Sequence, residues 1–295
     1  MRPAATATTV LDSTLFRDAF GMPRMREAFS DYALVGCYAE VEVALAKAEA
    51  KCGVIPADAA EAIAARTDVA ALDFDLLREE TDNVGHPILP LVHQIAKQRG
   101  EAGRYVHWGA TPQDIVDTAV VLQMRQCLKL LKADIAAQRR ILSGLSRCHR
   151  DTPMAGRTHL QQGLPVTFGY KTSIWLAVFD RHAERLEQLK PRVMVGQFAG
   201  AAGTLASLSD KGLEVQSALC EEFGLGVPVS TRHVVRDGFA EVINFLALVT
   251  GSLGKIALDI MIMASTEFAE VYEPFVKGPA PHRPCRRSAT PSRPS

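Results

Sequence analysis

One stretch of this 295-residue sequence decides how the chain folds: Gly156-Arg-Thr-His-Leu-Gln-Gln-Gly-Leu-Pro-Val-Thr-Phe-Gly169. We predict no strand here, because polar and turn-forming residues dominate, and we expect a long helix to run from Pro165 to about Leu189. Burying so many polar groups costs free energy unless each finds a partner. A bound anion would satisfy Thr158, His159 and Gln161 together. The alternative is a capped helix start with a histidine at the surface.

A second polar stretch lies upstream: Arg104-Tyr-Val-His-Trp-Gly-Ala-Thr-Pro-Gln-Asp-Ile-Val-Asp-Thr118. Thr111 suits a helix N-cap, Pro112 the first helical position, and Asp114 the acidic third position. We predict a helix over residues 112 to about 147. The free backbone amides and the dipole of such a helix attract anions. Both stretches therefore predict an anionic ligand.

These stretches resemble the two conserved blocks of the fumarase/aspartase superfamily. Gly109-Ala-Thr-Pro-Gln-Asp-Ile-Val-Asp-Thr118 is similar to the first block, with Pro112 where a serine is usual, and residues 156–167 are similar to the second. The resemblance covers nearly the whole chain. Within the superfamily, Met25-Arg-Glu-Ala-Phe-Ser-Asp31 and Gln197-Phe-Ala-Gly-Ala-Ala-Gly203 resemble the 3-carboxy-cis,cis-muconate cycloisomerase branch.

The resemblance implies an enzyme that lactonises a carboxymuconate in aromatic catabolism, the protocatechuate or β-ketoadipate route. The alternative within the family is a fumarate-releasing lyase of the adenylosuccinate or argininosuccinate type, acting on an N-substituted aspartate. Bacterial cycloisomerases often carry tryptophan where this chain has His159, which favours the lyase. An alternative of another class is a non-catalytic helical scaffold that keeps the fold.

By the same resemblance, His159 is the catalytic general acid, a role that suits the ordinary pKa of histidine. Charge builds up on a substrate carboxylate in either reaction, so fixed donors contribute most to catalysis. The residues expected to bind substrate are His107, Thr111, Gln113, Thr158 and Gln197. We expect a small di- or tricarboxylate as substrate. We expect no metal and no organic cofactor, because no His, Cys or acidic cluster has ligand spacing.

Composition excludes several other classes of protein. The 33 basic side chains equal the 33 acidic ones, so no overall field favours a nucleic acid or an acidic membrane surface. Six cysteines without a CxxC pair indicate a reducing compartment. The most apolar stretch, residues 245–263, is interrupted by Lys255 and Asp259, so we predict no membrane span. We therefore expect a cytoplasmic protein without a signal peptide.

Helical periodicity predicts an all-α fold with long helices that pack in a bundle. The resemblance implies that this is a fumarase/aspartase-like long helix bundle preceded by a small helical domain. Further helices are predicted over residues 34–52, 57–65, 87–98 and 237 to about 276. His182 falls in the helix predicted from Pro165 to about Leu189, where its charged neighbours favour a solvated side chain. We expect an N-terminal domain over residues 1–103 and an incomplete central bundle over residues 104–278, with the C-terminal domain missing. Long apolar-striped helices also favour a homotetramer, because antiparallel packing would place the two histidine blocks at distant ends of one chain.

Residues 279–295 differ in composition from the rest of the chain, with no acidic residue and repeated prolines. Relatives carry at this place a catalytic loop of the pattern Gly-Ser-Ser-x-Met-Pro-x-Lys. A back-translation of the tail, read in another frame, gives Ser-Ser-Thr-Met-Pro-Gln-Lys. We therefore expect an out-of-frame, disordered tail, and an inactive polypeptide as written.

Overall fold

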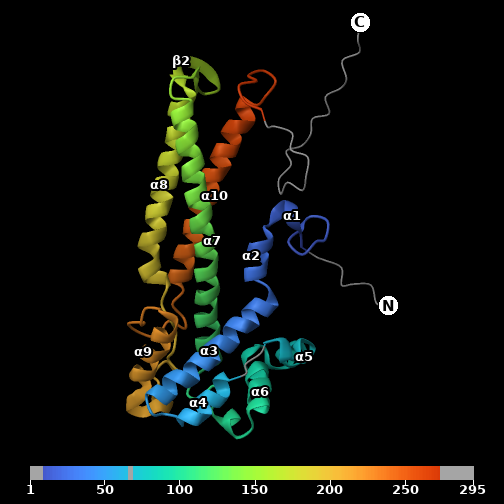
Figure 1. The fold of residues 1–295 in the computed structure, drawn as a ribbon, viewed down its shortest axis with the longest axis vertical. Helices are drawn as coiled ribbons and strands as arrows, with labels where there is room; N and C mark the ends of the chain where they lie inside the picture. The colour runs from blue at the N-terminus through green and yellow to red at the C-terminus, as the bar shows by residue number, and fades with distance from the viewer. Residues whose placement is uncertain (1–8, 66–68, 273–295) are drawn as a thin grey trace, which may run out of the picture.

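The computed structural model describes residues 9–65 and 69–272, which form a long, mainly helical molecule (Figure 1). The helices are α1 (Arg17–Phe20), α2 (Pro23–Ala28), α3 (Asp31–Lys51), α4 (Ala57–Ala64), α5 (Phe74–Val84), α6 (Ile88–Arg99), α7 (Pro112–Cys148), α8 (Phe168–Val193), α9 (Gly212–Phe223) and α10 (Asp237–Met263). Short 3-10 segments are η1 (Val69–Ala71), η2 (Gly100–Tyr105) and η3 (Ala206–Lys211). The strands are β1 (Pro153–Thr158) and β2 (Gln161–Thr167). The predicted out-of-frame tail lies outside the described residues.

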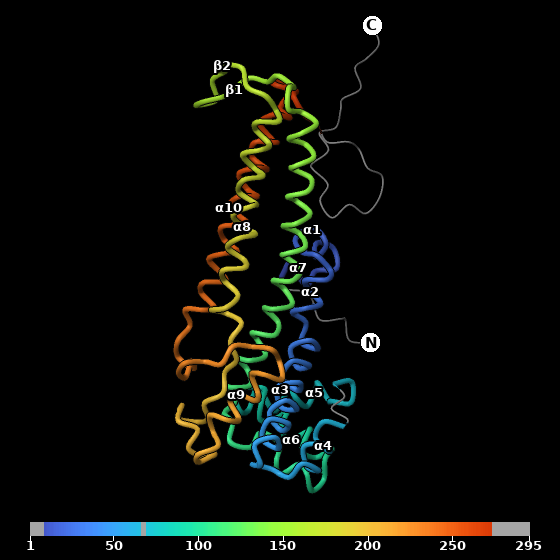
Figure 2. Tube along the Cα trace, turned by 60° about the vertical axis from the view of Figure 1, so that its left-hand side comes forward, coloured from blue at the N-terminus to red at the C-terminus, as the bar shows by residue number. Residues whose placement is uncertain are grey.

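Three long helices, α7, α8 and α10, run side by side and form a shaft (Figures 1 and 2). α7 alone has 37 residues, which corresponds to about 55 Å. Trp175, Phe179 and Phe245 are among the buried side chains that hold the shaft together. Asp259 of α10 accepts a hydrogen bond from Trp175 Nε1 (3.1 Å) and pairs with Lys171 of α8 (3.3 Å). The charge that interrupts the apolar stretch of α10 is therefore neutralised between helices.

His182 lies in the core of the shaft, although its charged sequence neighbours predict a solvated side chain. It is 2% exposed, and its ring packs edge-on against Phe179 and Phe245. Ser252 Oγ donates to the Leu248 carbonyl and accepts from His182 Nε2 at 2.9 Å. The prediction is wrong because α8 turns this position toward α10 rather than toward water.

The other end of the molecule is a small helical domain, in which α3, α4, α6 and α9 pack around the first turns of α7 (Figure 1). Its core includes Leu45, Ile63, Leu91, Ile115 and Leu219, all nearly inaccessible to water. α9 joins this core from far along the chain. The core therefore draws residues from both sides of the boundary predicted at residue 103.

A β-hairpin caps the shaft at the end opposite the small domain, where the sequence analysis predicts no strand. Pro165 pairs with Ala155 inside this hairpin, so α8 begins only at Phe168. Thr167 caps the helix, its hydroxyl accepting the Tyr170 N–H at 3.1 Å. The prediction of a helix start at Pro165 is wrong because residues 161–167 pair with β1 directly across a short turn.

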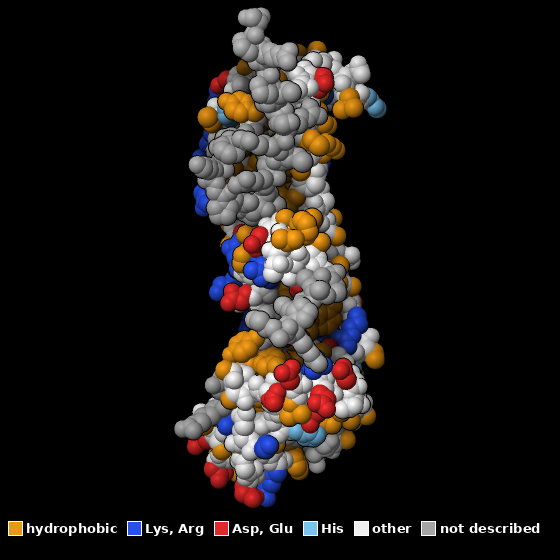
Figure 3. Space-filling model, turned by 90° about the vertical axis from the view of Figure 1, so that its right-hand side faces the viewer, with side chains coloured by type: hydrophobic (Ala, Val, Ile, Leu, Met, Phe, Trp, Pro, Cys, Tyr) orange, Lys and Arg blue, Asp and Glu red, His pale blue; other side chains and the backbone are white. Residues whose placement is uncertain are grey.

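α10 ends at Met263, well before the predicted end near residue 276. The chain folds back there, and the Glu270 N–H donates to the Met263 carbonyl at 2.9 Å. By length and composition α10 could cross a membrane, and only 11% of its most apolar window is buried. Its outer face carries exposed large side chains, including Ile243 and Met261. Hydrophobic side chains also recur along the face of the molecule in Figure 3.

Candidate functional site

Asp114, the acidic residue of the first block, organises the N-terminal end of α7. Its side chain is inaccessible to water. One carboxylate oxygen accepts the N–H groups of Thr111 (3.0 Å) and Gly200 (3.0 Å), and the other accepts the Ala199 N–H (2.9 Å). Thr111 is thus the N-cap in a capping box, as the sequence predicts. A buried carboxylate needs such donors, because desolvation would otherwise make its charge very costly.

Two side chains complete the shell around Asp114. Gln197 donates from Nε2 at 3.3 Å and His233 from Nε2 at 2.7 Å, both to the same carboxylate oxygen. The amide oxygen of Gln197 accepts the Arg232 N–H at 2.9 Å. Gln197 is 2% exposed, so its amide makes these hydrogen bonds inside the protein. Both polar groups of the Gln197 side chain are therefore engaged in ordering these loops, and its predicted contact with substrate stays a prediction.

Gln113, next to Asp114 at the start of α7, lies nearer the protein surface. Its Nε2 donates to Asp117 Oδ1 at 2.7 Å, and Arg236 Nη1 donates to the same oxygen at 2.7 Å. Gln113 remains partly exposed, as does Thr111. The structure therefore places Thr111 and Gln113 at the surface of the cluster and Gln197 beneath it.

His107 joins this cluster through a carboxylate of α3. Its Nδ1 lies 2.7 Å from Glu42 Oε1, and the Glu42 side chain is completely buried. Burial lowers the pKa of His107, but the hydrogen bond to Glu42 and the charges of Glu42 and Asp114 outweigh it, so the pKa is raised above 6.5. His107 is therefore favoured as a cation beside the N-terminus of α7.

A second buried carboxyl, that of Glu49, lies two helical turns further along α3. Neither oxygen of Glu49 has a hydrogen-bond partner among the described residues. Burial, together with the charge of Glu42, raises the pKa of Glu49 to about 9. Sequence reasoning missed Glu42, Glu49 and His233. The two glutamates could have been found, because they continue the apolar period of Val35, Ala39 and Ala46.

Thr158 and His159, from the second block, lie at the tip of the hairpin, both exposed. His159 (φ 50°) and Leu160 (φ 60°) are both left-handed, a conformation that costs free energy in residues other than glycine. Arg157 anchors the tip by two hydrogen bonds to Glu270, at 2.6 and 2.7 Å. The whole length of α7 separates this tip from His107, so one chain does not bring its two histidine blocks together.

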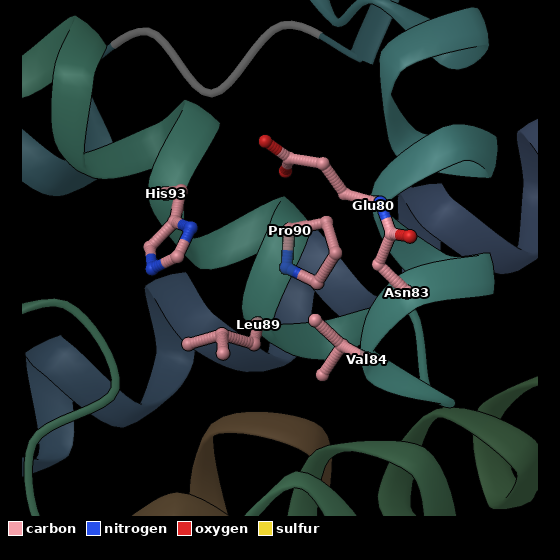
Figure 4. Close-up of a pocket in the computed structure, with 6 residues that line it drawn as sticks. All are labelled: Glu80, Asn83, Val84, Leu89, Pro90 and His93. Carbon is pink, nitrogen blue, oxygen red and sulfur yellow. The ribbon is translucent and has the colours of Figure 1, made fainter.

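A small hollow of about 150 Å³ lies between α5 and α6. Figure 4 shows Glu80, Asn83 and Val84 facing Leu89 and His93 across it. None of its lining residues belongs to either block. Within residues 9–65 and 69–272, no group of three or more His, Cys, Asp and Glu side chains is placed to hold a metal ion.

Comparison with known proteins agrees with both blocks. A family model described as "Lyase" matches residues 19–279. The chain belongs to the fumarase/aspartase lyase family. The resemblance drawn from the two blocks is thereby confirmed, and so is the helical fold of that family.

The chain has relatives that are named for several different activities. It is 43% identical to 3-carboxy-cis,cis-muconate cycloisomerase of Acinetobacter baylyi, over 90% of this chain and 60% of that protein. It is 39% identical to N-acetyl-S-(2-succino)cysteine lyase of Dickeya dadantii, over 92% of this chain and 60% of that one. The crystal structure of a fumarate lyase from Mesorhizobium sp. BNC1 is 57% identical with a TM-score of 0.83, covering 85% of this chain and 59% of that one. The chain thus spans about three fifths of the length of these relatives.

Proposed function

We propose that this lyase adds or removes a group at the carbon next to a substrate carboxylate, with a carboxymuconate as the first candidate substrate. The observation that carries the proposal is the cluster at the start of α7. There His107, whose pKa is raised by its hydrogen bond to Glu42, and the partly exposed Thr111 and Gln113 surround the positive end of a 37-residue helix dipole. Such an end favours a carboxylate. The identity to a carboxymuconate cycloisomerase supports the choice of substrate.

In the proposed lactonisation, an oxygen of one substrate carboxylate bonds to a carbon of the double bond. The electron pair of that double bond moves to the neighbouring carbon, which lies beside a second carboxylate and then takes up a proton. Thr111, Gln113 and His107 would hold carboxylates, Thr158 would add a hydroxyl donor, and His159 would act as general acid.

A second candidate is the elimination of fumarate from an N- or S-substituted succinate. Here a proton leaves the carbon beside the carboxylate, and the neighbouring carbon–nitrogen or carbon–sulfur bond breaks with its electron pair passing to the leaving group. His159, where bacterial cycloisomerases often carry tryptophan, favours this reaction. So do the identities to a succinocysteine lyase and to a fumarate lyase.

We also propose that the active site is assembled between copies in a homotetramer. His107 and His159 lie at opposite ends of α7, so neighbouring copies must supply them to one site. The exposed face of α10 offers an apolar surface for this contact: Ile243 is 65% and Met261 64% exposed.

A membrane is a poorer partner for α10, because Lys255 and Asp259 would enter the hydrocarbon. We also propose a cytoplasmic location, which the six cysteines without a CxxC pair support. Sedimentation of a well-folded monomer at micromolar concentration would contradict the proposed homotetramer.

The protein expressed from its gene, once the reading frame after residue 278 has been checked by resequencing, decides between the substrates by ultraviolet absorbance. Carboxymuconate, adenylosuccinate, argininosuccinate and N-acetyl-S-(2-succino)cysteine each change conjugation when they react, either by losing a conjugated system or by releasing fumarate. We expect carboxymuconate to be consumed. Turnover of a succinate derivative alone would support the second candidate. No reaction with any of the four would refute both and favour a non-catalytic scaffold.

A further inference from the structure

The contact between Glu42 and His107 joins a residue of the hydrophobic core to one at the surface of the proposed site. Glu42 lies on α3, is 1% exposed, and belongs to neither conserved block. Its Oε1 is 2.7 Å from His107 Nδ1, and its Oε2 has no hydrogen-bond partner among the described residues. A carboxylate buried this deeply is costly unless a cation compensates it. The histidine ring is the compensating group that it contacts.

The backbone of His107 is also constrained. It has φ 63°, and Gly109, two residues on, has φ 68°. A left-handed histidine is uncommon and persists only where its surroundings hold it. The hydrogen bond between Nδ1 and Glu42 fixes the histidine ring in this position. Since Nδ1 is engaged in the core, Nε2 is the ring nitrogen left for a ligand, and the side chain keeps 16% of its surface exposed.

We propose that Glu42 is a positioning residue, which holds His107 by Nδ1 so that Nε2–H is presented as a charged donor to a substrate carboxylate at the start of α7. This inference rests on the proposed function, because it assumes that a carboxylate binds there. The charged groups that act on His107 are Glu42 from α3 and Asp114 from α7. Asp114 already accepts five hydrogen bonds, one of them from His233 in the loop before α10. Glu42 is therefore the only one of the two acids that bonds to the His107 ring.

The direct test is the titration of the His107 ring in the wild-type protein and in Glu42→Gln, followed by NMR with ¹⁵N-labelled histidine. The His107 signal is assigned by its loss in His107→Asn, chosen because asparagine tolerates the left-handed backbone. In the wild type we expect both ring nitrogens to be protonated in most molecules at pH 6.5. In Glu42→Gln we expect the pKa of His107 to fall by at least about one unit, because burial then lacks its main opposing charge. Glu49→Gln is the matched control, since it removes a buried carboxyl from the same helix without touching His107.

Citrate serves as a carboxylate probe for the second arm. We expect Glu42→Gln to weaken citrate binding at pH 7.5 by about tenfold, in line with a shift of one pKa unit. In the His107→Asn background the same change should have almost no further effect, because Glu42 acts through His107.

Three results would overturn the proposal: an unchanged His107 titration in Glu42→Gln, an equal shift in Glu49→Gln, or additive effects in the double variant. If Glu42→Gln does not fold, the wild-type ring still decides, since a neutral His107 at pH 6.5 contradicts the proposal. A failure of the proposed function is distinguishable from a failure of this inference. A protein that turns over none of the four substrates can still show the coupling between Glu42 and His107.

Discussion

Replacing Glu49 with glutamine tests the unusual ionisation of the α3 core. The pKa of this carboxyl is raised from 4.5 to about 9, first by burial and then by the charge of Glu42. Between these two values the folded state binds a proton that the unfolded state has released, so stability falls as the pH rises through the window. Each pH unit corresponds to about 1.4 kcal/mol, so the penalty at pH 7 relative to pH 4.5 is about 3 kcal/mol.

Glutamine keeps the shape of the protonated acid but does not titrate. We therefore expect Glu49→Gln to gain about 1.4 kcal/mol on the wild type for each unit from pH 6 to pH 8. Urea unfolding of both proteins at pH 6, 7 and 8 measures this gain. Glu40→Gln, an exposed position on the same helix, is the control for loss of one carboxyl group. A difference between Glu49→Gln and the wild type that stays constant across these three pH values would refute the reasoning.

Four further outcomes are expected. Burial, followed by the charges of Arg185 and Arg181, lowers the pKa of His182. Below pH 6.5 the folded state therefore binds fewer protons at His182 than the unfolded state, so thermal stability falls as the pH drops. His182→Gln should remove that part of the pH dependence of the melting temperature. Asp114→Asn should cost about 3–5 kcal/mol in urea unfolding, because it replaces one oxygen of a buried carboxylate that accepts five hydrogen bonds and leaves some of those donors unpaired; a loss under about 1 kcal/mol would contradict the organising role. His159→Trp should be mild if the protein is a cycloisomerase but lower kcat by at least about 100-fold if it is an elimination lyase, and equal damage to binding and turnover would defeat the general-acid role. Dialysis against a chelator should leave activity intact, whereas a loss that zinc or magnesium restores would refute the expected absence of a metal.

The sequence predicted the elements whose signals are local. Thr111, Pro112 and Asp114 mark the start of α7 by side chains that act within one turn, and the structure confirms that start. Pro165 was misread because its place depends on pairing with Ala155 across the hairpin, which no single-segment pattern reveals. His182 was misread for a similar reason, since the identity of the helix that it faces is a property of the tertiary fold.

The candidate site divides in the same way. His107, Thr111 and Gln113 follow from the first block and its likeness to a family. His233 and Glu42 reach the site from separate parts of the chain, and the contacts that bring them there span 119 and 65 residues. Sequence spacing carries no signal for such contacts, although the two glutamates on the apolar period of α3 gave a partial one.

The shell of donors around Asp114 sets an order of events during synthesis. The backbone amide of Gly200 lies 86 residues after Asp114, and the His233 ring lies 119 residues after it. At about 5–20 residues per second, a ribosome adds His233 roughly 6 to 24 seconds after Asp114. Until then the carboxylate of Asp114 lacks one of its five donors, so burying it under the small domain costs more free energy than in the finished fold. Long-range closures of this kind slow folding. The charge that finally orders the site is thus also what delays its assembly.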